Sequence, residues 1–492
     1  MALTQTQFIV DLFLLLAGSL FAGEVASRLG QPALVGQLLV GVVFGPTVFG
    51  QYLGLTSLPA EFSSIQFLAT VFILFLAGLE IVPEEIYRMG VLTALLGVAI
   101  FAIPFSGLFL VTTVLFPGVS TLKALFIALT LSITALPVMG IMLVQFGLLH
   151  QPLGKFLMNA ALINELTAVT VFAVLLELYT GHGSGTASVG LAVVALAVFL
   201  SVMIGIYVIL RALQKTRFWG EIRDRFARDW RSKGAGFAIL MVLVVGASLF
   251  SQFLGLTFVV GAFYAGLLVT RETAGVTTHK SISTVFDTIS WGFFIPLFFA
   301  FVGLQMDLRL LDSPYLLLVF SSLLVVAVVL KVLVGDLAGR LRGWNPVDSR
   351  AIGFLVSSRG AVELAMAVIL LQDGVFNVQL FTIVAGVGLL TTIIAPIGAL
   401  RTWQSTEQSQ EDLFQRVPSL RDSAARGWIR APALAWGDVR DFHVDPSDVG
   451  RPLAPAPRAE TTETPATPPA AAAPDAPIRP PLPSPRRKPP VI

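Results

Sequence analysis

Long apolar runs separated by short polar stretches dominate the chain from residue 7 to residue 401. A helix needs about 20 mostly apolar residues to cross the hydrocarbon core of a bilayer. Runs of this kind predict about thirteen membrane-spanning helices in an all-α polytopic membrane protein. We place these spans at 7–29, 33–49, 63–82, 91–116, 121–146, 154–180, 186–213, 234–253, 256–271, 283–306, 314–341, 348–371 and 376–401.

The composition supports the membrane assignment and excludes several other classes. Only 13% of the 492 residues are charged, whereas soluble globular proteins carry about 25%. A soluble enzyme of this length would lack the polar surface that it needs. The chain has no cysteine, which excludes disulfides and thiolate metal sites. Its net charge of +2 gives no indication of a nucleic-acid partner.

Basic residues in the loops predict the orientation in the membrane. One set of loops holds most of the Lys and Arg residues, many of them in the loop 211–233, while the other set holds only Lys123 and Arg309. Cytoplasmic loops carry the basic excess. With thirteen spans, the N-terminus lies outside and the C-terminus in the cytoplasm of a plasma membrane, which we expect to be a bacterial inner membrane.

The composition changes after the last span, so the chain divides into a membrane domain (1–402) and a tail (403–492). The tail is rich in Pro and Ala, cannot bury a core, and is predicted to be disordered in the cytoplasm. Its Arg486-Arg487-Lys488 cluster fits a site for an unidentified cytoplasmic partner, a contact with the membrane surface, or a solvated end.

The membrane domain contains an internal repeat with a fixed offset of 225 residues. The matching pairs are Leu29-Gly30 with Leu254-Gly255, 35–41 with 260–266, 77–80 with 302–305, and Ser132 with Ser357. Repeat one covers 7–180 and repeat two covers 234–402, with a linker helix (186–213) and the basic loop (211–233) between them. Equivalent spans then enter the membrane from opposite sides. Inverted repeats of this kind are typical of secondary transporters, whose ion site lies near the midplane.

The fifth and twelfth spans are predicted to be unwound at mid-membrane. The fifth holds Ser132, Thr134 and Pro137 in "ALTLSITALPVMG" (128–140), and the twelfth holds Ser357 and Ser358 in "FLVSSRGAVELA" (354–365). Pro137 removes a backbone hydrogen bond to residue 133. Freed carbonyls and hydroxyls at this depth are tolerated when they face a cavity. The alternative is that the hydroxyls only pack or bond back to their own helix.

Glu165, preceded by Asn164, lies in the middle of the sixth span and is the leading functional candidate. Ionisable groups deep in a membrane are costly, and they mark functional sites. A low dielectric favours the protonated carboxyl, whereas a bound cation favours the carboxylate, so the two compete. Asn164 adds a carbonyl oxygen that suits a monovalent cation at Glu165. The alternative is a purely structural ion pair between Glu165 and Lys331.

The twelfth and eleventh spans contribute three more buried charges. Arg359 and Glu363 are four residues apart and share a helix face, so they either neutralise each other or line and gate a cavity. Lys331 either balances the negative end of a half-helix or pairs with Glu165 when no ion is bound. The remaining carboxylates stand nearer span ends, where snorkelling or local pairing explains them. They are Asp11, Glu24, Glu80, Glu177 and Asp336.

Several motifs together resemble the monovalent cation:proton antiporter family, in the branch of bacterial sodium/proton antiporters and gated potassium efflux systems. They are "GQPALVGQLLVGVVFGP" (30–46), "LFLAGLEI" (74–81), "LGLTFVVGAFYAGLL" (254–268), "FFIPLFFAFVGLQMDL" (293–308) and "SSRGAVELAMA" (357–367). The resemblance implies the sodium/proton antiporter fold, a homodimer, and an elevator-like movement of the ion site.

The resemblance also assigns roles to individual residues. Asn164 and Glu165 match the Asp-Asp or Asn-Asp pair of the sixth helix, Lys331 matches the membrane-embedded lysine, and the unwound crossing matches Ser132–Thr134 and Ser357–Arg359. Asn at the first position implies electroneutral exchange. Glu in place of Asp moves the carboxylate by about 1.5 Å, so the choice of ion stays open.

The sequence thus predicts a secondary active transporter that exchanges Na⁺ or K⁺ for protons, with no enzymatic activity and no cofactor. Two alternatives remain at this point. One is a potassium efflux protein that works like a channel, in which Glu165 shapes a pore without exchanging a proton. The other is a sensor or scaffold that transports nothing and acts through its tail.

Overall fold

The computed structural model describes residues 5–53, 59–81, 89–149, 151–180, 186–214, 235–270 and 276–404. Every regular element in these ranges is helical, which confirms the fold class. Nine helical stretches here are long and apolar enough to cross a membrane, and five shorter apolar helices accompany them. Each predicted span overlaps a helix or two half-helices. The total of thirteen crossings stays a prediction. The predicted tail and most of the basic loop lie outside the described residues.

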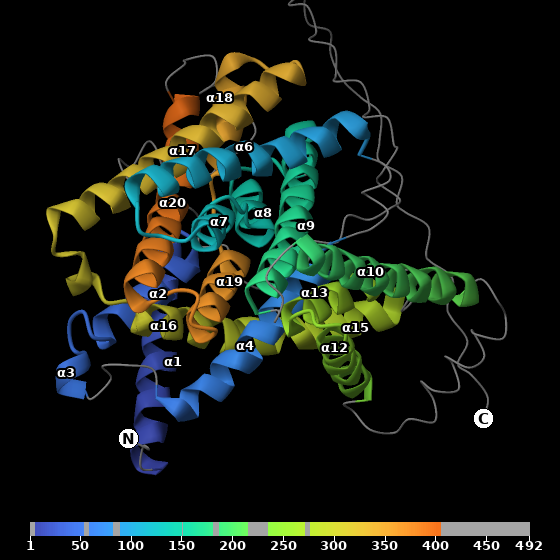
Figure 1. Cartoon of the computed structure of the whole chain (residues 1–492), viewed down its shortest axis with the longest axis horizontal. Coiled ribbons are helices and arrows are strands. Elements are labelled where there is room, and N and C mark those ends of the chain that lie inside the picture. Colours follow the sequence, from blue (N-terminus) through green and yellow to red (C-terminus); the bar gives the residue numbers. More distant parts are fainter. Residues whose placement is uncertain are drawn as a thin grey trace, which may run out of the picture. The chain divides into compact units, whose positions relative to one another are not determined.

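One group of helices, called the panel here, is built from the beginnings of the two repeats. It contains α1 (Gln5–Arg28), α2 (Ala33–Phe44), α4 (Ala60–Leu79), α12 (Ala235–Phe253), α13 (Phe258–Leu268), α15 (Val276–Ile289), the π-helical turn η1 (Ser290–Phe294) and α16 (Ile295–Gln305). Within it α2 packs against α1 and α16, and α13 packs against α12 and α4. The short α3 (Gly50–Leu53) follows α2. α1 leads to the N-terminus in Figure 1 and contacts α2 and α16.

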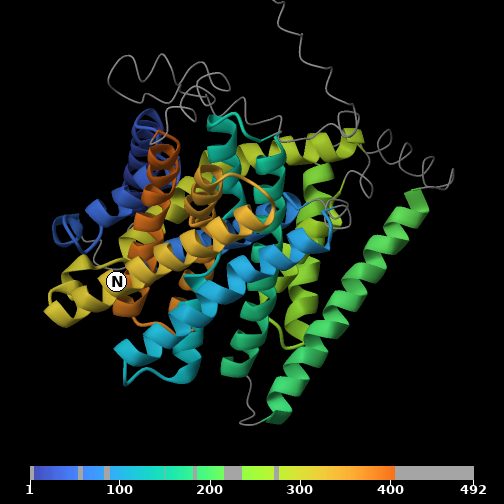
Figure 2. The same ribbon diagram turned by 90° about the horizontal axis from the view of Figure 1, so that it is seen from above.

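A second group, called the bundle, is built from the ends of the two repeats. It contains α6 (Val91–Leu115), α7 (Thr121–Thr130), α8 (Leu136–Gln145), α9 (Pro152–Thr180), α17 (Pro314–Leu341), α18 (Pro346–Val356), α19 (Ala361–Gln372) and α20 (Val378–Gln404). Both views show α17 beside α6, and the two helices are in contact (Figures 1 and 2). The linker α10 (Thr186–Gln214) contacts α9 of the bundle and α13 of the panel.

The helix bounds follow the 225-residue offset throughout the two groups. In the panel, α2 corresponds to α13; in the bundle, the pair α7 and α8 corresponds to α18 and α19. The close packing matches too. A Cβ added to Gly41 would lie 1.9 Å from the Ala300 carbonyl oxygen, and one added to the equivalent Gly266 would lie 2.3 Å from that of Phe75. Glycine therefore allows the same backbone approach twice. The inverted orientation of the halves in a bilayer stays a prediction.

Local sequence explains why the helices end where they do. α2 ends at Phe44, five residues before the predicted end, because Gly45 is extended and precedes Pro46. Ser313 caps α17 by accepting from the Leu316 N–H, and Pro314 fits its first turn. Large apolar side chains are exposed on the outer faces of several helices, as expected where hydrocarbon replaces water. Examples are Phe13 and Phe21 on α1, Ile204 on α10, and Leu318 and Leu333 on α17.

Candidate functional site

The fifth and twelfth predicted spans are each interrupted in the middle. α7 ends at Thr130 and α8 begins at Leu136, while α18 ends at Val356 and α19 begins at Ala361. Pro137 lies in the first turn of α8, where its missing N–H costs no helical bond. The segments 131–135 and 357–360 are called break one and break two below. Both occur where the sequence predicts unwinding.

The two breaks contact each other through their backbones. The Ala135 N–H donates to the Ser358 carbonyl oxygen at 3.2 Å. A Cβ added to Gly360 would lie 2.7 Å from the Ala135 Cβ, so only glycine allows this approach without a shift. Residues more than 220 positions apart in the chain thus form one buried structure of four helix ends.

Each break sends one side chain to the helix that precedes the other break. The Thr134 hydroxyl donates to the Val356 carbonyl oxygen at the end of α18, at 2.8 Å. Arg359 donates to the carbonyl oxygens of Thr130, at 3.2 Å, and Leu131, at the end of α7. Thr134 and Arg359 occupy equivalent positions in the repeat. Both satisfy carbonyls that the interrupted helices leave without partners.

Asn164 of α9 binds break one through both ends of its amide. Its Oδ1 accepts from the Thr134 N–H at 2.8 Å, and its Nδ2 donates to the Ser132 carbonyl oxygen at 3.4 Å. The sequence suggests this oxygen as a cation ligand. In the structure it already holds the backbone of break one, so Asn164 supports the local conformation.

Lys331 of α17 is fully buried and donates from Nζ to the Thr134 hydroxyl at 2.7 Å. Since that hydroxyl donates onward to Val356, the ammonium charge is connected to the C-terminal end of α18, where the helix dipole is negative. No ion pair joins Lys331 to Glu165 among the described residues. In this conformation Lys331 therefore balances the negative end of a half-helix and does not pair with Glu165.

Glu165, one residue after Asn164 on α9, is completely buried. Neither of its carboxylate oxygens has a hydrogen-bond partner of regular geometry. Its carboxylate lies on the side of the Leu136 N–H, in the first turn of α8. The N-terminus of a helix carries partial positive charge and free N–H groups. Glu165 therefore faces a helix end that favours its ionised form, without an opposing side-chain charge.

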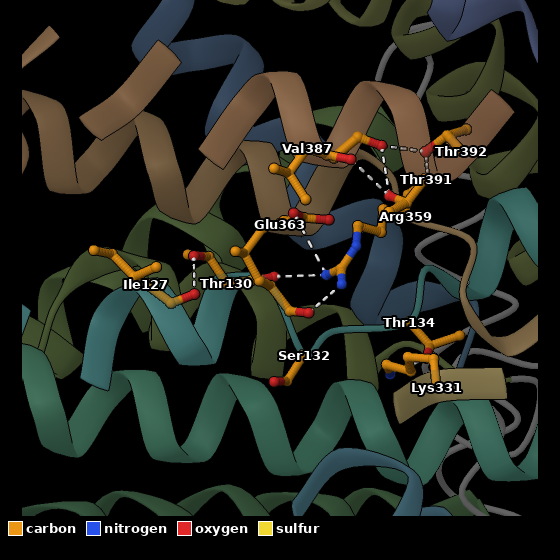
Figure 3. Close-up of polar contacts among 12 residues, drawn as sticks. Ile127, Thr130, Ser132, Thr134, Lys331, Arg359, Glu363, Val387, Thr391 and Thr392 are labelled. Atoms are coloured by element: carbon orange, nitrogen blue, oxygen red, sulfur yellow. Dashed lines mark hydrogen bonds and ion pairs between the residues drawn. The ribbon is translucent and has the colours of Figure 1, made fainter. Parts of the chain in front are cut away.

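Arg359 and Glu363 form a buried ion pair, with 3.6 Å between Nη1 and Oε1. Figure 3 shows the guanidinium between the Glu363 carboxylate and the carbonyls at the end of α7. The predicted neutralisation is therefore present. The serines of the breaks are less informative, because Ser132 and Ser357 bond back to the carbonyls of Ala128 and Phe354. Ser358 Oγ is buried and has no partner.

Glu80 and Asp287 belong to this neighbourhood, which the sequence analysis missed. Glu80, at the end of α4, lies within electrostatic range of Glu165 and of Asp287 on α15. Glu80 is half-buried, and one of its carboxylate oxygens is buried without a partner. α4 packs against α19 of the bundle. One feature of the sequence could have pointed to Glu80. It belongs to the "AGLE" segment, which matches "VGLQ" in repeat two.

Two of the other span-end carboxylates differ in outcome. Asp336 pairs with Arg340 at 2.9 Å, which confirms local pairing there. Asp11 is only 5% exposed, and its Oδ2 has no partner, so snorkelling does not explain it. Within the described ranges no three His, Asp or Glu side chains come close enough to hold a metal ion.

Comparisons with known proteins identify the family. A sequence model described as "Sodium/hydrogen exchanger, transmembrane" matches residues 12–403. The chain belongs to this family. It is similar to the Na(+)/H(+) antiporter NhaS4 of Synechocystis, with 27% identity over 389 residues that make up 76% of this chain and 91% of the relative. It is also similar to the Na(+)/H(+)-K(+) antiporter GerN of Bacillus cereus, with 26% identity over 401 residues that make up 80% of this chain and 95% of the relative.

A solved structure supports the same assignment at the level of fold. The sodium proton antiporter MjNhaP1 from Methanocaldococcus jannaschii, at pH 8, has a TM-score of 0.57 to this chain at 18% identity. The match covers 80% of this chain and 98% of that one. The resemblance read from the motifs is confirmed, as are the antiporter fold and the placement of the chain in a membrane.

Proposed function

We propose that this protein is a secondary active transporter that exchanges Na⁺ or K⁺ for protons, and that both ions compete for Glu165. The observation that carries the proposal is the Glu165 carboxylate, which is fully buried with neither oxygen hydrogen-bonded. Both relatives named above are called Na(+)/H(+) antiporters, one of them with K(+) as well. Their names support the cation class.

A buried carboxylate without a counter-charge costs several kcal/mol. A proton or a cation removes most of this cost, but one carboxylate does not readily hold both. The binding of one ion thus releases the other. Since the empty site is costly, the occupied states are favoured for crossing the membrane. This coupling is what exchange requires.

The surrounding charges support Glu165 as the residue that binds the transported ion. Four half-helix ends meet at the breaks, and each has an ionisable group nearby. Arg359 lies at the end of α7, and Lys331 reaches the end of α18 through Thr134. Glu363 stands in the first turn of α19, and Glu165 faces the start of α8. Arg359 and Glu363 also pair with each other. Of these four groups, Glu165 is the one without a side-chain partner.

The same arrangement supports electroneutral exchange. Asn164, next to Glu165, carries no charge, and Lys331 is held by Thr134. The site then carries the same net charge whether it holds one proton or one cation. One cation would therefore move for each proton.

We further propose an elevator-type movement of the bundle against the panel, in a homodimer. Close glycine-mediated contacts such as Gly41 with Ala300 and Gly266 with Phe75 lie within the panel and favour a rigid frame. The panel would hold the dimer interface, because the family resemblance implies a dimerisation domain separate from the mobile core. We also propose that the N-terminus lies outside the cell and the C-terminus in the cytoplasm.

The test is cation-dependent proton flux in proteoliposomes or everted vesicles that contain a pH-sensitive dye. Addition of Na⁺ or K⁺ should cause dequenching with the wild-type protein, and Glu165→Gln should abolish it. Glu165→Asp keeps the charge and should retain exchange with altered cation affinity. Unchanged exchange in Glu165→Gln would refute the assignment. Cation flux without proton movement in the wild type would indicate the channel-like alternative, and no flux at all would favour the sensor.

A further inference from the structure

Arg359 and Glu363 form a buried ion pair that neither binds nor releases an ion in the exchange cycle proposed above. Both side chains are at most 1% exposed. Arg359 donates to the Thr130 and Leu131 carbonyls, whereas neither oxygen of Glu363 accepts a regular hydrogen bond. In Figure 3 the Glu363 carboxylate points at the guanidinium, which also reaches the carbonyls at the end of α7. Glu363 thus contributes its charge and little else to the local bonding.

The neighbours of Glu363 leave its charge with only two cations to act on. Among the described residues, Arg359 and Lys331 are the charged groups that interact with it. The small cavity beside the pair is lined by neutral side chains. These are Leu34 and Leu38 of α2, Leu364 of α19 itself, and Gly388, Leu389 and Thr392 of α20. The space between them is too small for a water molecule.

We propose that Glu363 is a positioning residue for exchange. It holds the Arg359 guanidinium against the end of α7, and its charge offsets the two buried cations beside the site of Glu165. This inference rests on the proposed function of Glu165 and deepens it. Glu363 itself neither binds the transported ion nor gives up a proton during the cycle.

The role has a quantitative consequence. Without the Glu363 charge, Arg359 and Lys331 leave an excess positive potential at the breaks. A proton and a monovalent cation each bring one positive charge to Glu165. The excess potential therefore weakens the binding of both ions by about the same free energy. A tenfold loss in cation affinity corresponds to a shift of one pH unit in the proton titration.

The test measures transport against cation concentration and pH in proteoliposomes for Glu363→Gln. We expect the apparent KM for the cation to rise about tenfold and the pH of half-maximal activity to fall by about one unit. The maximal rate at saturating cation should stay within about threefold of the wild type. Glu363→Asp keeps the charge and should restore most of both values. Glu24→Gln makes the same charge change on the exposed part of α1 and should alter neither value.

A second variant covers the case in which Glu363→Gln does not accumulate in the membrane. A Cβ at Gly388 would lie 3.1 Å from the Glu363 Oε1, so Gly388→Ala moves the carboxylate while keeping its charge. We expect the same two shifts at a smaller size, about two- to threefold in KM and about 0.3 to 0.5 unit in pH.

A purely structural role of Glu363 would not shift the apparent KM and the pH of half-maximal activity together by matching amounts. If Glu363→Gln lowers only the maximal rate, or if KM changes without the pH profile, the proposal is wrong. It is also wrong if Glu363→Asp behaves like Glu363→Gln. Failure of the proposed function is visible separately, in the same vesicles, as wild-type protein without exchange or Glu165→Gln with full exchange.

Discussion

The two breaks have the same backbone design and different side-chain chemistry. In both, a half-helix ends, a few residues are extended, and a side chain at an equivalent position satisfies the carbonyls of the opposite half-helix. In break one that side chain is the neutral Thr134, and in break two it is the cationic Arg359. The neighbouring helices differ in the same way, since Asn164 and Glu165 on α9 correspond to Leu389 and Leu390 on α20.

This difference separates what the two halves contribute to the candidate site. Both halves supply the geometry of the crossing. The first half supplies the carboxylate without a partner, and the second supplies the fixed charges Lys331, Arg359 and Glu363. Their equivalents in the first half are Ser106, Thr134 and Val138, none of which is ionisable at neutral pH. In the proposed exchange, the carboxylate whose charge changes belongs to the first half, and the charges that stay belong to the second.

The largest expected effect is on stability. It comes from removing Arg359 or Thr134, the two side chains that reach from one break to the opposite half-helix and are called the clamps here. Arg359→Gln leaves the Glu363 carboxylate without its counter-charge and should lower the free energy of unfolding by about 3–5 kcal/mol. Thr134→Val at the equivalent position removes two hydrogen bonds, the one donated to the Val356 carbonyl and the one accepted from Lys331 Nζ, and should cost about 1–3 kcal/mol. Thermal or denaturant unfolding in detergent measures both. Equal costs, or a larger cost for Thr134→Val, would mean that the two clamps are not chemically distinct.

A smaller effect should follow from adding a second carboxylate to the first half. In Asn164→Asp, an Asp oxygen can still accept from the Thr134 N–H, but the donation to Ser132 is lost. Two titratable groups would let more than one proton move per cation, so transport becomes sensitive to voltage. Moving one charge through 100 mV is worth about 2.3 kcal/mol.

Proteoliposomes with the membrane potential first clamped and then released measure this sensitivity. The rate of Asn164→Asp should change severalfold between the two conditions, while that of the wild type should not. A wild-type rate that depends on voltage would contradict the electroneutral proposal. Asn164→Gln keeps the side chain neutral and serves as the control.

The smallest expected effect concerns Glu80, which lies in the panel near Glu165. Glu80→Gln removes a nearby negative charge, so Glu165 should lose its proton more readily. The pH of half-maximal exchange should then fall by less than one unit, with the maximal rate retained. An unchanged pH profile would show that Glu80 does not act on the site. Glu24→Gln on α1 is again the matched control.

Local patterns were enough to predict the helices and the positions of the breaks. The spans follow from apolar runs, and the interruption after Thr130 follows from Pro137 and its neighbours. The repeat offset, read from a few short matches, anticipated helix bounds as separate as those of α2 and α13. Glu165 stood out because no loop or helix end explains a carboxylate in the middle of an apolar span.

The partners of these residues could not be predicted in the same way. Asn164 was predicted to offer its oxygen to a cation, which stays a prediction; that this oxygen also accepts from the Thr134 N–H could not be read from the sequence. Glu80 does stand at the end of α4, but its position along the chain says nothing about its nearness to Glu165 and Asp287. Side-chain contacts across more than a hundred residues depend on how helices rotate and pack, and apolar periodicity leaves that rotation undetermined.

The sequence by itself thus determined the membrane class, the duplicated design and the central carboxylate, because hydrophobic length and charge scarcity act locally along the chain. The tertiary structure alone decided which buried charges are paired. Lys331 binds Thr134 and Arg359 binds Glu363, while Glu165 faces the start of α8. The physical reason is that a charge in a low dielectric is controlled by whatever packing brings within a few ångströms, wherever that group lies in the sequence.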